Sequence, residues 1–369
     1  MPHGRAKMRA VTHPHVTAQM EAFGVDVLVL CGENNIAYAT GRVARSQEPA
    51  RAGANRRVAI ITRDGAEVLA PSPLDFEAGA REFARAVDDH RGVVAIDEWP
   101  SLVAHDALRH RAPVEAATLL AQAKFVKTPD EVERIRAAQR CNERAMDAAR
   151  TLAVPGANQT DVTAAFYRAV FEAGATGNTV DPIWDVVPRS RGDVGITLTG
   201  HLPFPTPTTD RVLAHGDVCF TDTGIDLDGW ASDVGRTWTI GVEPDARQRD
   251  QFERWKAVCE ACQRAIEPGA TAADVARAAT RANGGESPWF PHLYVAHGVG
   301  TESAELPFCG TDLGPEIEDR VILGPGTILV LEPVIWDDGY GGYRSEEIVV
   351  VTDGGCERLT DYTYAPYTT

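Results

Sequence analysis

The sequence predicts an α+β protein of two domains, a small N-terminal α/β domain and a larger C-terminal domain whose helices cover antiparallel strands. Three observations carry this expectation. Short apolar runs alternate with helical patterns in the first third of the chain, a long helical stretch follows, and one loop–helix pattern then occurs twice. The 369 residues suffice for two cores, and we place a flexible tail at 1–14, the N-terminal domain at 15–122 and the second domain at 123–369.

The N-terminal domain is predicted from short buried strands separated by helical periodicity. The expected strands are 25–30, 58–62 and 93–96, and the expected helices are 16–23, 76–86 and 101–110. The segment Asn35-Ile36-Ala37-Tyr38-Ala39-Thr40-Gly41 follows the first strand. The Arg- and Ala-rich segment 42–57 is expected to be an exposed loop.

The second domain is expected to begin with a helix from Pro129 to Leu152, which Thr128 and an acidic first turn introduce. Beyond it, residues 155–162 and 268–275 resemble each other, because both begin Pro-Gly-Ala and then offer a residue that can cap a helix. We interpret this repeat as two related halves of one domain. The alternative is two unrelated loop–helix starts that look alike.

The composition excludes several classes of function. The net charge of −17 and the pI near 5.0 argue against binding to nucleic acid or to an anionic membrane surface. No apolar run approaches the roughly 18 residues of a membrane span, and no signal-peptide core follows the start. The seven scattered cysteines suit a reducing cytoplasm, and Cys259-x-x-Cys262 has no second cysteine pair at zinc-finger spacing.

The stretch from Cys219 to Trp238 contains four aspartates within twelve residues, around the hairpin-turn pattern Asp228-Gly229. With a two-residue loop, Asp222 pairs with Gly235 and Asp233 lies diagonally across from it; with a four-residue loop, the two aspartates face each other. In both registers the carboxylates share one face of the sheet at roughly 5–8 Å. Two like charges at that distance need a cation between them, and a metal ion is the simplest one.

Three more potential ligands occur farther along the chain. His297 precedes glycines that let the backbone approach a ligand closely. Glu332 and Glu346 each interrupt an apolar strand. The two glutamates are equally distant from Gly339, so an odd-length loop centred there places them opposite each other.

The five residues together suit two divalent ions bridged by carboxylates; they are Asp222, Asp233, His297, Glu332 and Glu346. Manganese is the expected metal, with cobalt, iron or zinc as alternatives. Two such ions about 3.5–4 Å apart can share a hydroxide nucleophile and polarise a substrate carbonyl. A single aspartate in a hairpin or a single histidine is usually structural, but five such residues in this order are much harder to explain that way.

Over most of its length the chain resembles the pita-bread-fold metallohydrolases, which include prolidase, aminopeptidase P and the metal-free enzyme creatinase. Asn35 to Gly41 is similar to a segment of their N-terminal, creatinase-like domain. The motifs similar to those of the family's catalytic domain are Asp222-x-Gly224, Ser232-Asp233-x-x-Arg236-Thr237, His297-Gly298-x-Gly300 with Glu305-x-Pro307, Glu332-Pro333 and Arg344-x-Glu346.

The resemblance implies a C-terminal pita-bread domain of two pseudo-symmetric halves that binds two metal ions. It implies that Asp233 and Glu346 bridge the ions and that Asp222 holds one of them. His297 and Glu332 would hold the other, and both are expected to be catalytic, with Glu332 moving the proton of the bridging water. The resemblance also implies a homodimer or a larger assembly.

The substrate side departs from the family pattern. Peptide-cleaving members usually carry histidines at two positions where this chain has Ala304 and Pro205. The expected substrate contacts are instead His201, His292, Tyr294 and Arg344. His201 can reach the site only if its proline-rich loop is rearranged, and loop packing is the alternative role for His292 and Tyr294.

Three functions are therefore weighed. The first is a dinuclear prolidase- or aminopeptidase P-like peptidase that cleaves Xaa-Pro or other short peptides with a metal-bridging hydroxide. The second is a metal-dependent hydrolase or lyase of a small metabolite of the ectoine, creatine or dimethylsulfoniopropionate type, which the loss of the two histidines favours. The third is a catalytically inactive binding protein that keeps the fold, and the retention of all five ligands disfavours it. We rank the peptidase first.

Overall fold

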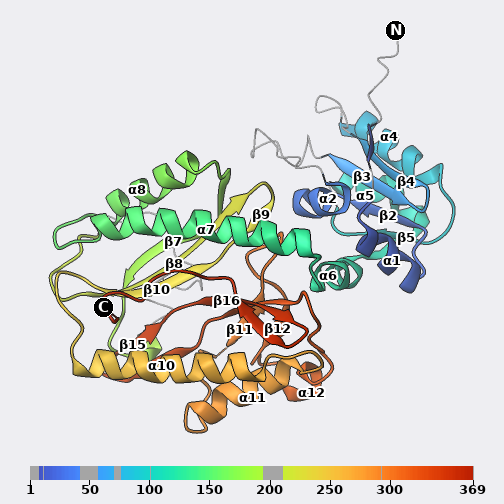
Figure 1. Ribbon diagram of the computed structural model, residues 1–369. Helices are drawn as coiled ribbons and strands as arrows, with labels where there is room; N and C mark the ends of the chain where they lie inside the picture. Colours follow the sequence, from blue (N-terminus) through green and yellow to red (C-terminus); the bar gives the residue numbers. More distant parts are fainter. Residues whose placement is uncertain are drawn as a thin grey trace. The chain divides into compact units, whose positions relative to one another are not determined.

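The computed structural model describes residues 8–10, 12–41, 57–69, 76–99, 101–193, 211–291 and 293–368. The chain divides into two compact units, Met1–Lys124 and Phe125–Thr369 (Figure 1). The division falls at the end of helix α6 (Ala117–Phe125).

The first unit is built on a six-stranded mixed sheet with the order β1-β4-β3-β2-β5-β6. Neighbouring strands run antiparallel, except that β5 is parallel to both β2 and β6. The strands are β1 (Met8–Ala10), β2 (Val27–Leu30), β3 (Val58–Thr62), β4 (Gly65–Leu69), β5 (Val94–Ile96) and β6 (Val114–Glu115). The other helices of this unit are α1 (Pro14–Ala22), α2 (Glu33–Thr40), α4 (Phe76–Asp88) and α5 (Leu102–Leu108).

The strands and helices predicted for this unit are present, with ends that differ by a few residues, but β1, β4 and β6 were not predicted. Strand β1 lies within the segment 1–14, for which we predicted a loose tail, and it pairs with β4. Both β1 and β6 are short edge strands, so they leave no alternating pattern long enough to detect. The predicted loop 42–57 lies outside the described residues, apart from Arg57.

Hydrogen bonds within this unit account for the segment from Asn35 to Gly41. Asp97, which follows β5, accepts hydrogen bonds from the backbone N–H of Cys31 (2.7 Å) and from the side-chain amide of Asn35 (2.8 Å). The Tyr38 hydroxyl donates to the carbonyl of Ala123 (2.6 Å). These contacts fix the loop between β2 and α2, so the segment has a structural role in this domain.

The second unit contains two larger sheets, with the orders β10-β8-β7 (β9 pairs with β8) and β12-β11-β13-β16-β17, and the separate hairpin β14–β15. The strands are β7 (Gly177–Val186), β8 (Val218–Leu227), β9 (Trp230–Ala231), β10 (Val234–Thr239), β11 (Ala296–Gly298), β12 (Glu305–Cys309), β13 (Ile328–Leu331), β14 (Val334–Asp337), β15 (Gly341–Arg344), β16 (Glu347–Thr352) and β17 (Gly355–Arg358). The helices are α7 (Pro129–Leu152), α8 (Gln159–Glu172), α10 (Ala246–Ala265), α11 (Ala272–Ala282) and α12 (Pro315–Glu318).

Helices flank the strands of this unit on two sides, with α7 and α8 on one and α10 and α11 on the other (Figure 1). Phe166 of α8 and Trp184 of β7 belong to the core beneath the first helix pair. Trp255 of α10 and Leu331 of β13 belong to the core beneath the second pair. Among the described helices, none combines the length and the apolar character that crossing a membrane requires.

The strand registers decide between the pairings that the sequence left open. Asp222 pairs with Gly235, as the two-residue Asp228-Gly229 loop predicts, and the four-residue alternative is excluded. Strands β14 and β15 pair about Gly339 in the predicted register, and β13 and β16 continue the same register. Glu332 and Glu346 lie where the ladder is interrupted between these two pairs of strands.

The repeat predicted in the second domain corresponds to two equivalent loop–strand contacts. Asn158 forms an isolated bridge to Val212 just before β8, and Thr271 forms one to Ile322 just before β13. Each residue also caps the helix that follows it, α8 or α11. The two halves of the second unit are therefore built alike, with a helix pair on the outside and a sheet on the inside.

Candidate metal centre

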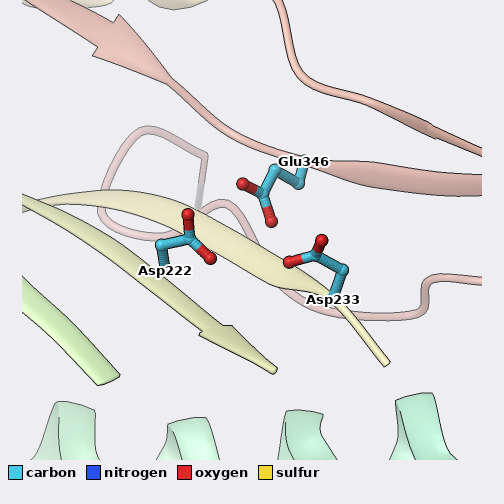
Figure 2. A group of neighbouring side chains, drawn as sticks. All are labelled: Asp222, Asp233 and Glu346. Carbon is cyan, nitrogen blue, oxygen red and sulfur yellow. The ribbon is translucent and has the colours of Figure 1, made fainter. Parts of the chain in front are cut away.

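Three carboxylates from distant parts of the sequence meet between the two halves of the second unit. Asp222 lies on β8, Asp233 directly precedes β10 and Glu346 directly precedes β16. One oxygen of each carboxylate lies within 4.8 Å of the others, and Figure 2 shows the three groups directed toward one another.

The Asp228-Gly229 turn and the small residue Gly235 bring these acids together. The tight Asp228-Gly229 turn fixes the β8–β9 pairing and so places Asp233, which directly precedes β10, beside Asp222. Opposite Asp222 stands Gly235, and a Cβ atom added there would lie 2.5 Å from Cδ of Glu346. The Glu346 carboxyl group therefore occupies the space that any other residue at 235 would fill.

His297 and Glu332 extend this cluster. The Nε2 atom of His297 lies 3.4 Å from Oδ2 of Asp233 and 3.3 Å from Oε1 of Glu332. Its Nδ1 atom lies 2.9 Å from the carbonyl oxygen of Gly298, which can only accept a hydrogen bond. Nδ1 therefore carries the proton in neutral His297, and the lone pair of Nε2 faces the carboxylates.

The four acids come in equivalent pairs from the two halves. Asp222 lies ten residues after the bridge residue Val212, and Glu332 lies ten residues after the equivalent Ile322. Each half thus contributes one acid at its central strand, Asp222 on β8 and Glu332 directly after β13, and a second acid that follows the next turn. His297 adds an imidazole from the second half alone.

Burial makes this arrangement electrostatically unfavourable without a cation. Desolvation raises the pKa of Asp233, and the negative charges of Asp222 and Glu332 raise that pKa further. Desolvation also raises the pKa of Glu346. Among the described residues, no donor forms a hydrogen bond with Oδ1 of Asp222, Oδ1 of Asp233 or Oε2 of Glu346.

Arg344 supplies one positive charge to the cluster. Its Nη1 atom lies 3.0 Å from Oδ2 of Asp222, and its Nη2 atom lies 2.5 Å from Oε1 of Glu346. Its Nε atom donates to Oε2 of Glu332 (3.1 Å), and the ring of Phe220 stacks on the guanidinium at 4.6 Å. One cation cannot neutralise four acids, and the oxygens left without a donor are the ligand type that divalent metal ions prefer. The residues present therefore fit a metal centre.

The comparison with known protein families agrees with this chemistry. The model of metallopeptidase family M24 matches residues 133–353, which is more than half of the chain and includes all five candidate ligands. The chain belongs to metallopeptidase family M24.

Curated relatives of this M24 chain include peptidases. A probable dipeptidase PepE of Mycobacterium tuberculosis is 30% identical over 252 residues, covering 66% of this chain and 60% of the relative. An Xaa-Pro dipeptidase of Pyrococcus furiosus is 29% identical over 243 residues, covering 64% and 63%. The matches thus span less than two thirds of the length of either relative.

Solved structures share the fold of this M24 chain. The prolidase of Pyrococcus horikoshii OT3 matches with a TM-score of 0.75 and 20% identity over 95% of this chain and 98% of that one. Dipeptidase PepE of Mycobacterium ulcerans matches with a TM-score of 0.74 and 24% identity over 95% of each chain. These matches confirm the predicted α+β pita-bread fold.

Of the four candidate substrate residues, the structure describes Tyr294 and Arg344. Tyr294 contacts the ring of His297 edge-on, with 5.1 Å between ring centroids. Burial raises the pKa of its hydroxyl, and the charges of Glu332 and Asp233 add to that effect. His201, His292 and Pro205 lie outside the described residues. Arg344 faces the acids as described above, and its predicted contact with substrate stays a prediction.

Sequence reasoning singled out the cluster but missed the residues behind it. Gln139 of α7 accepts a hydrogen bond from the backbone N–H of Asp233 (3.2 Å). Arg236 and Glu347 form a buried ion pair at 3.1 Å behind Glu346. The sequence places Arg236 in the motif around Asp233 and Glu347 as a second acid in an apolar strand. Nothing in the sequence shows that Arg236 and Glu347 pair with each other.

Proposed function

We propose that this protein is a hydrolase that uses two divalent metal ions, with manganese as the expected metal. The observation that carries the proposal is the convergence of Asp222, Asp233 and Glu346, each with a buried oxygen that no donor among the described residues satisfies, with the Nε2 lone pair of His297 beside them. Membership of family M24 supports it.

The proposed roles are those that the resemblance to the family implies. Asp233 and Glu346 would each contact both ions, Asp222 would complete one ligand set, and His297 with Glu332 would complete the other. When bound, the ions would activate a water molecule and polarise the bond to be cleaved. Glu332 would accept the proton of that water and pass it to the leaving group.

The proposed substrates are short peptides, Xaa-Pro dipeptides among them. The names of the relatives, a probable dipeptidase and an Xaa-Pro dipeptidase, support this choice. Tyr294 is the proposed substrate contact nearest to the metal ligands, because its ring touches that of His297. His201, His292 and Arg344 remain further proposed contacts.

A second candidate function is that of a metal-dependent hydrolase or lyase that acts on a small metabolite that is not a peptide. It is favoured by Ala304, which lies seven residues after His297 and offers no hydrogen-bond donor from its side chain. A site without that donor stabilises a developing oxyanion less well.

Metal content tests the dinuclear assignment. Elemental analysis of protein loaded with Mn²⁺ and desalted should give two ions per chain for the wild type and a large loss for Asp233→Ala and Glu346→Ala. Asp228→Asn is the matched control, because it removes an acid from the same hairpin at a turn position that asparagine tolerates. Full metal content in both alanine variants would refute the assignment.

A peptide panel tests the substrate class. The Mn²⁺-loaded enzyme would be assayed on Xaa-Pro dipeptides, on other dipeptides and on longer Xaa-Pro peptides. Turnover of any of these would support the peptidase. Two bound ions without turnover on the whole panel would favour the metabolite hydrolase.

We further propose a cytoplasmic homodimer. All seven cysteines are free, as the cytoplasm would keep them. The mass in solution, measured by light scattering, tests the dimer.

A further inference from the structure

Arg236 is a fully buried arginine on β10, and its side chain makes hydrogen bonds to three separate parts of the chain. Nη1 donates to the carbonyl oxygens of Gly235 (2.8 Å) and Glu346 (2.7 Å). Nε and Nη2 donate to the carbonyl oxygens of Thr363 (3.1 Å) and Tyr362 (3.0 Å) near the C-terminus. The guanidinium thus joins the two halves of the catalytic unit and its last segment.

The adjacent acids Glu346 and Glu347 point in opposite directions, as consecutive residues of an extended chain do. The Glu346 carboxylate faces Asp222 and Asp233 (Figure 2). The Glu347 carboxylate instead lies 3.1 Å from Nη2 of Arg236, and both side chains of this pair are 1% exposed. One acid therefore belongs to the candidate metal centre, and its neighbour anchors the strand that carries it.

The backbone of Glu346 is held on both sides by β10. Its N–H donates to the carbonyl oxygen of Gly235 (3.0 Å), and its own carbonyl oxygen accepts from Arg236. Glu346 lies in the interruption between the β14–β15 and β13–β16 pairings, so no regular ladder fixes it. The contacts with Gly235 and Arg236 take the place of that ladder.

We infer that Arg236 is a positioning residue for the metal centre, because it fixes the Glu346 backbone and so sets the distance from the Glu346 carboxylate to Asp222 and Asp233. The inference rests on the proposed dinuclear function. Metal ligands need their distances kept to within a few tenths of an ångström, and residues that orient ligands typically change metal affinity by about 10- to 100-fold when they are replaced. Glu347 contributes by keeping the guanidinium charge paired where it is buried.

The test is the Mn²⁺ affinity of metal-free protein, measured by titration calorimetry at a temperature where each variant is folded. Arg236→Lys keeps the charge but cannot donate to Glu346 and Glu347 in the same fork. We expect it to weaken Mn²⁺ binding about 10- to 100-fold. Arg358→Gln is the matched control: Arg358 approaches the other Glu347 oxygen at 3.7 Å from a half-exposed position, and its loss should change the affinity less than about threefold.

A purely structural role makes a different prediction. It would lower the melting temperature of Arg236→Lys but leave the affinity of the folded fraction, and the electron paramagnetic resonance spectrum of coupled Mn²⁺ pairs, as in the wild type. That result would overturn the inference. If Arg236→Lys does not fold, the pair Arg236→Gln with Glu347→Gln removes both buried charges and leaves none unpaired, and wild-type affinity in that protein would equally overturn it.

The two proposals fail separately. A wild type that binds no Mn²⁺ refutes the dinuclear function itself. A wild type that binds two ions, together with an Arg236→Lys variant that binds them equally well, refutes only the positioning role.

Discussion

Alanine at position 235 should displace Glu346 from the acid cluster. The added Cβ would lie 2.5 Å from Cδ and 2.7 Å from Oε1 of Glu346. Carbon atoms in contact prefer about 3.5 Å or more, so the carboxyl group must move by about 1 Å. Gly235 lies within β10 at a backbone conformation open to alanine, so the effect comes from lost space and not from backbone strain.

A shift of this size exceeds what metal coordination tolerates. Ligand distances vary by roughly 0.2 Å, and misplacement of a reacting group by about 1 Å costs about 100-fold in rate. We therefore expect Gly235→Ala to lose most of its bound Mn²⁺. Its kcat/KM on any substrate that the wild type turns over should fall about 100-fold, or about 2.7 kcal/mol of transition-state stabilisation.

The assay combines metal analysis, steady-state kinetics and thermal melting of the metal-free protein. Overpacking costs about 1–3 kcal/mol of stability, so the variant should still fold. Gly324→Ala is the matched control, since a Cβ there meets no atom within 4 Å. Wild-type metal content and kcat/KM in Gly235→Ala would refute the claim that Glu346 needs this space.

Three further predictions concern stability and the substrate side. Lys127→Met should lower the free energy of unfolding, measured with urea, by about 3–5 kcal/mol, because it leaves Glu305 as an unpaired buried acid where the wild type has an ion pair at 2.6 Å. Combining Lys127→Met with Glu305→Gln should restore part of that loss. A loss below about 1 kcal/mol would contradict this account. The hydrogen bond from Arg277 is the main reason that the pKa of Asp274 is lowered to about 2. The ionised carboxylate therefore stabilises the folded state at pH values above its unfolded pKa, near 3.9. This contribution disappears as the pH falls toward 2. The stability difference between wild type and Asp274→Asn, at most about 1 kcal/mol at this half-exposed site, should therefore be present at pH 7 and shrink below pH 4, and a difference independent of pH would argue against it. Tyr294→Phe should keep two bound ions and lower kcat/KM, whereas unchanged kinetics would remove Tyr294 from the substrate contacts.

Local sequence rules predicted the parts of the site that local geometry controls. The Asp228-Gly229 turn contained enough information to set the register that pairs Asp222 with Gly235. The equal spacing about Gly339 likewise predicted the register of β14 and β15. In both cases a short turn fixes the pairing of the strands on either side, so the outcome depends on a few neighbouring residues.

Contacts between distant segments were not predictable in this way. Nothing local to Arg236 shows that its guanidinium reaches the carbonyl oxygen of Glu346, more than a hundred residues later. The interruption of the ladder at Glu332 and Glu346 was also missed, because an odd-length hairpin predicts continuous pairing. On the substrate side, loops determine which side chains reach the site, and loop conformation leaves no periodic pattern in a sequence.

The equivalence of the two halves has a thermodynamic consequence. The acids Asp222 and Asp233 come from one half, and Glu332 and Glu346 come from the other, so a metal ion held by both Asp233 and Glu346 would bind only while the halves are docked. Metal binding and docking are then linked equilibria, and at a free metal concentration 100 times Kd the docked state gains about 2.7 kcal/mol. The proposed ions would then stabilise the docking of the two repeats in addition to supplying the proposed chemistry.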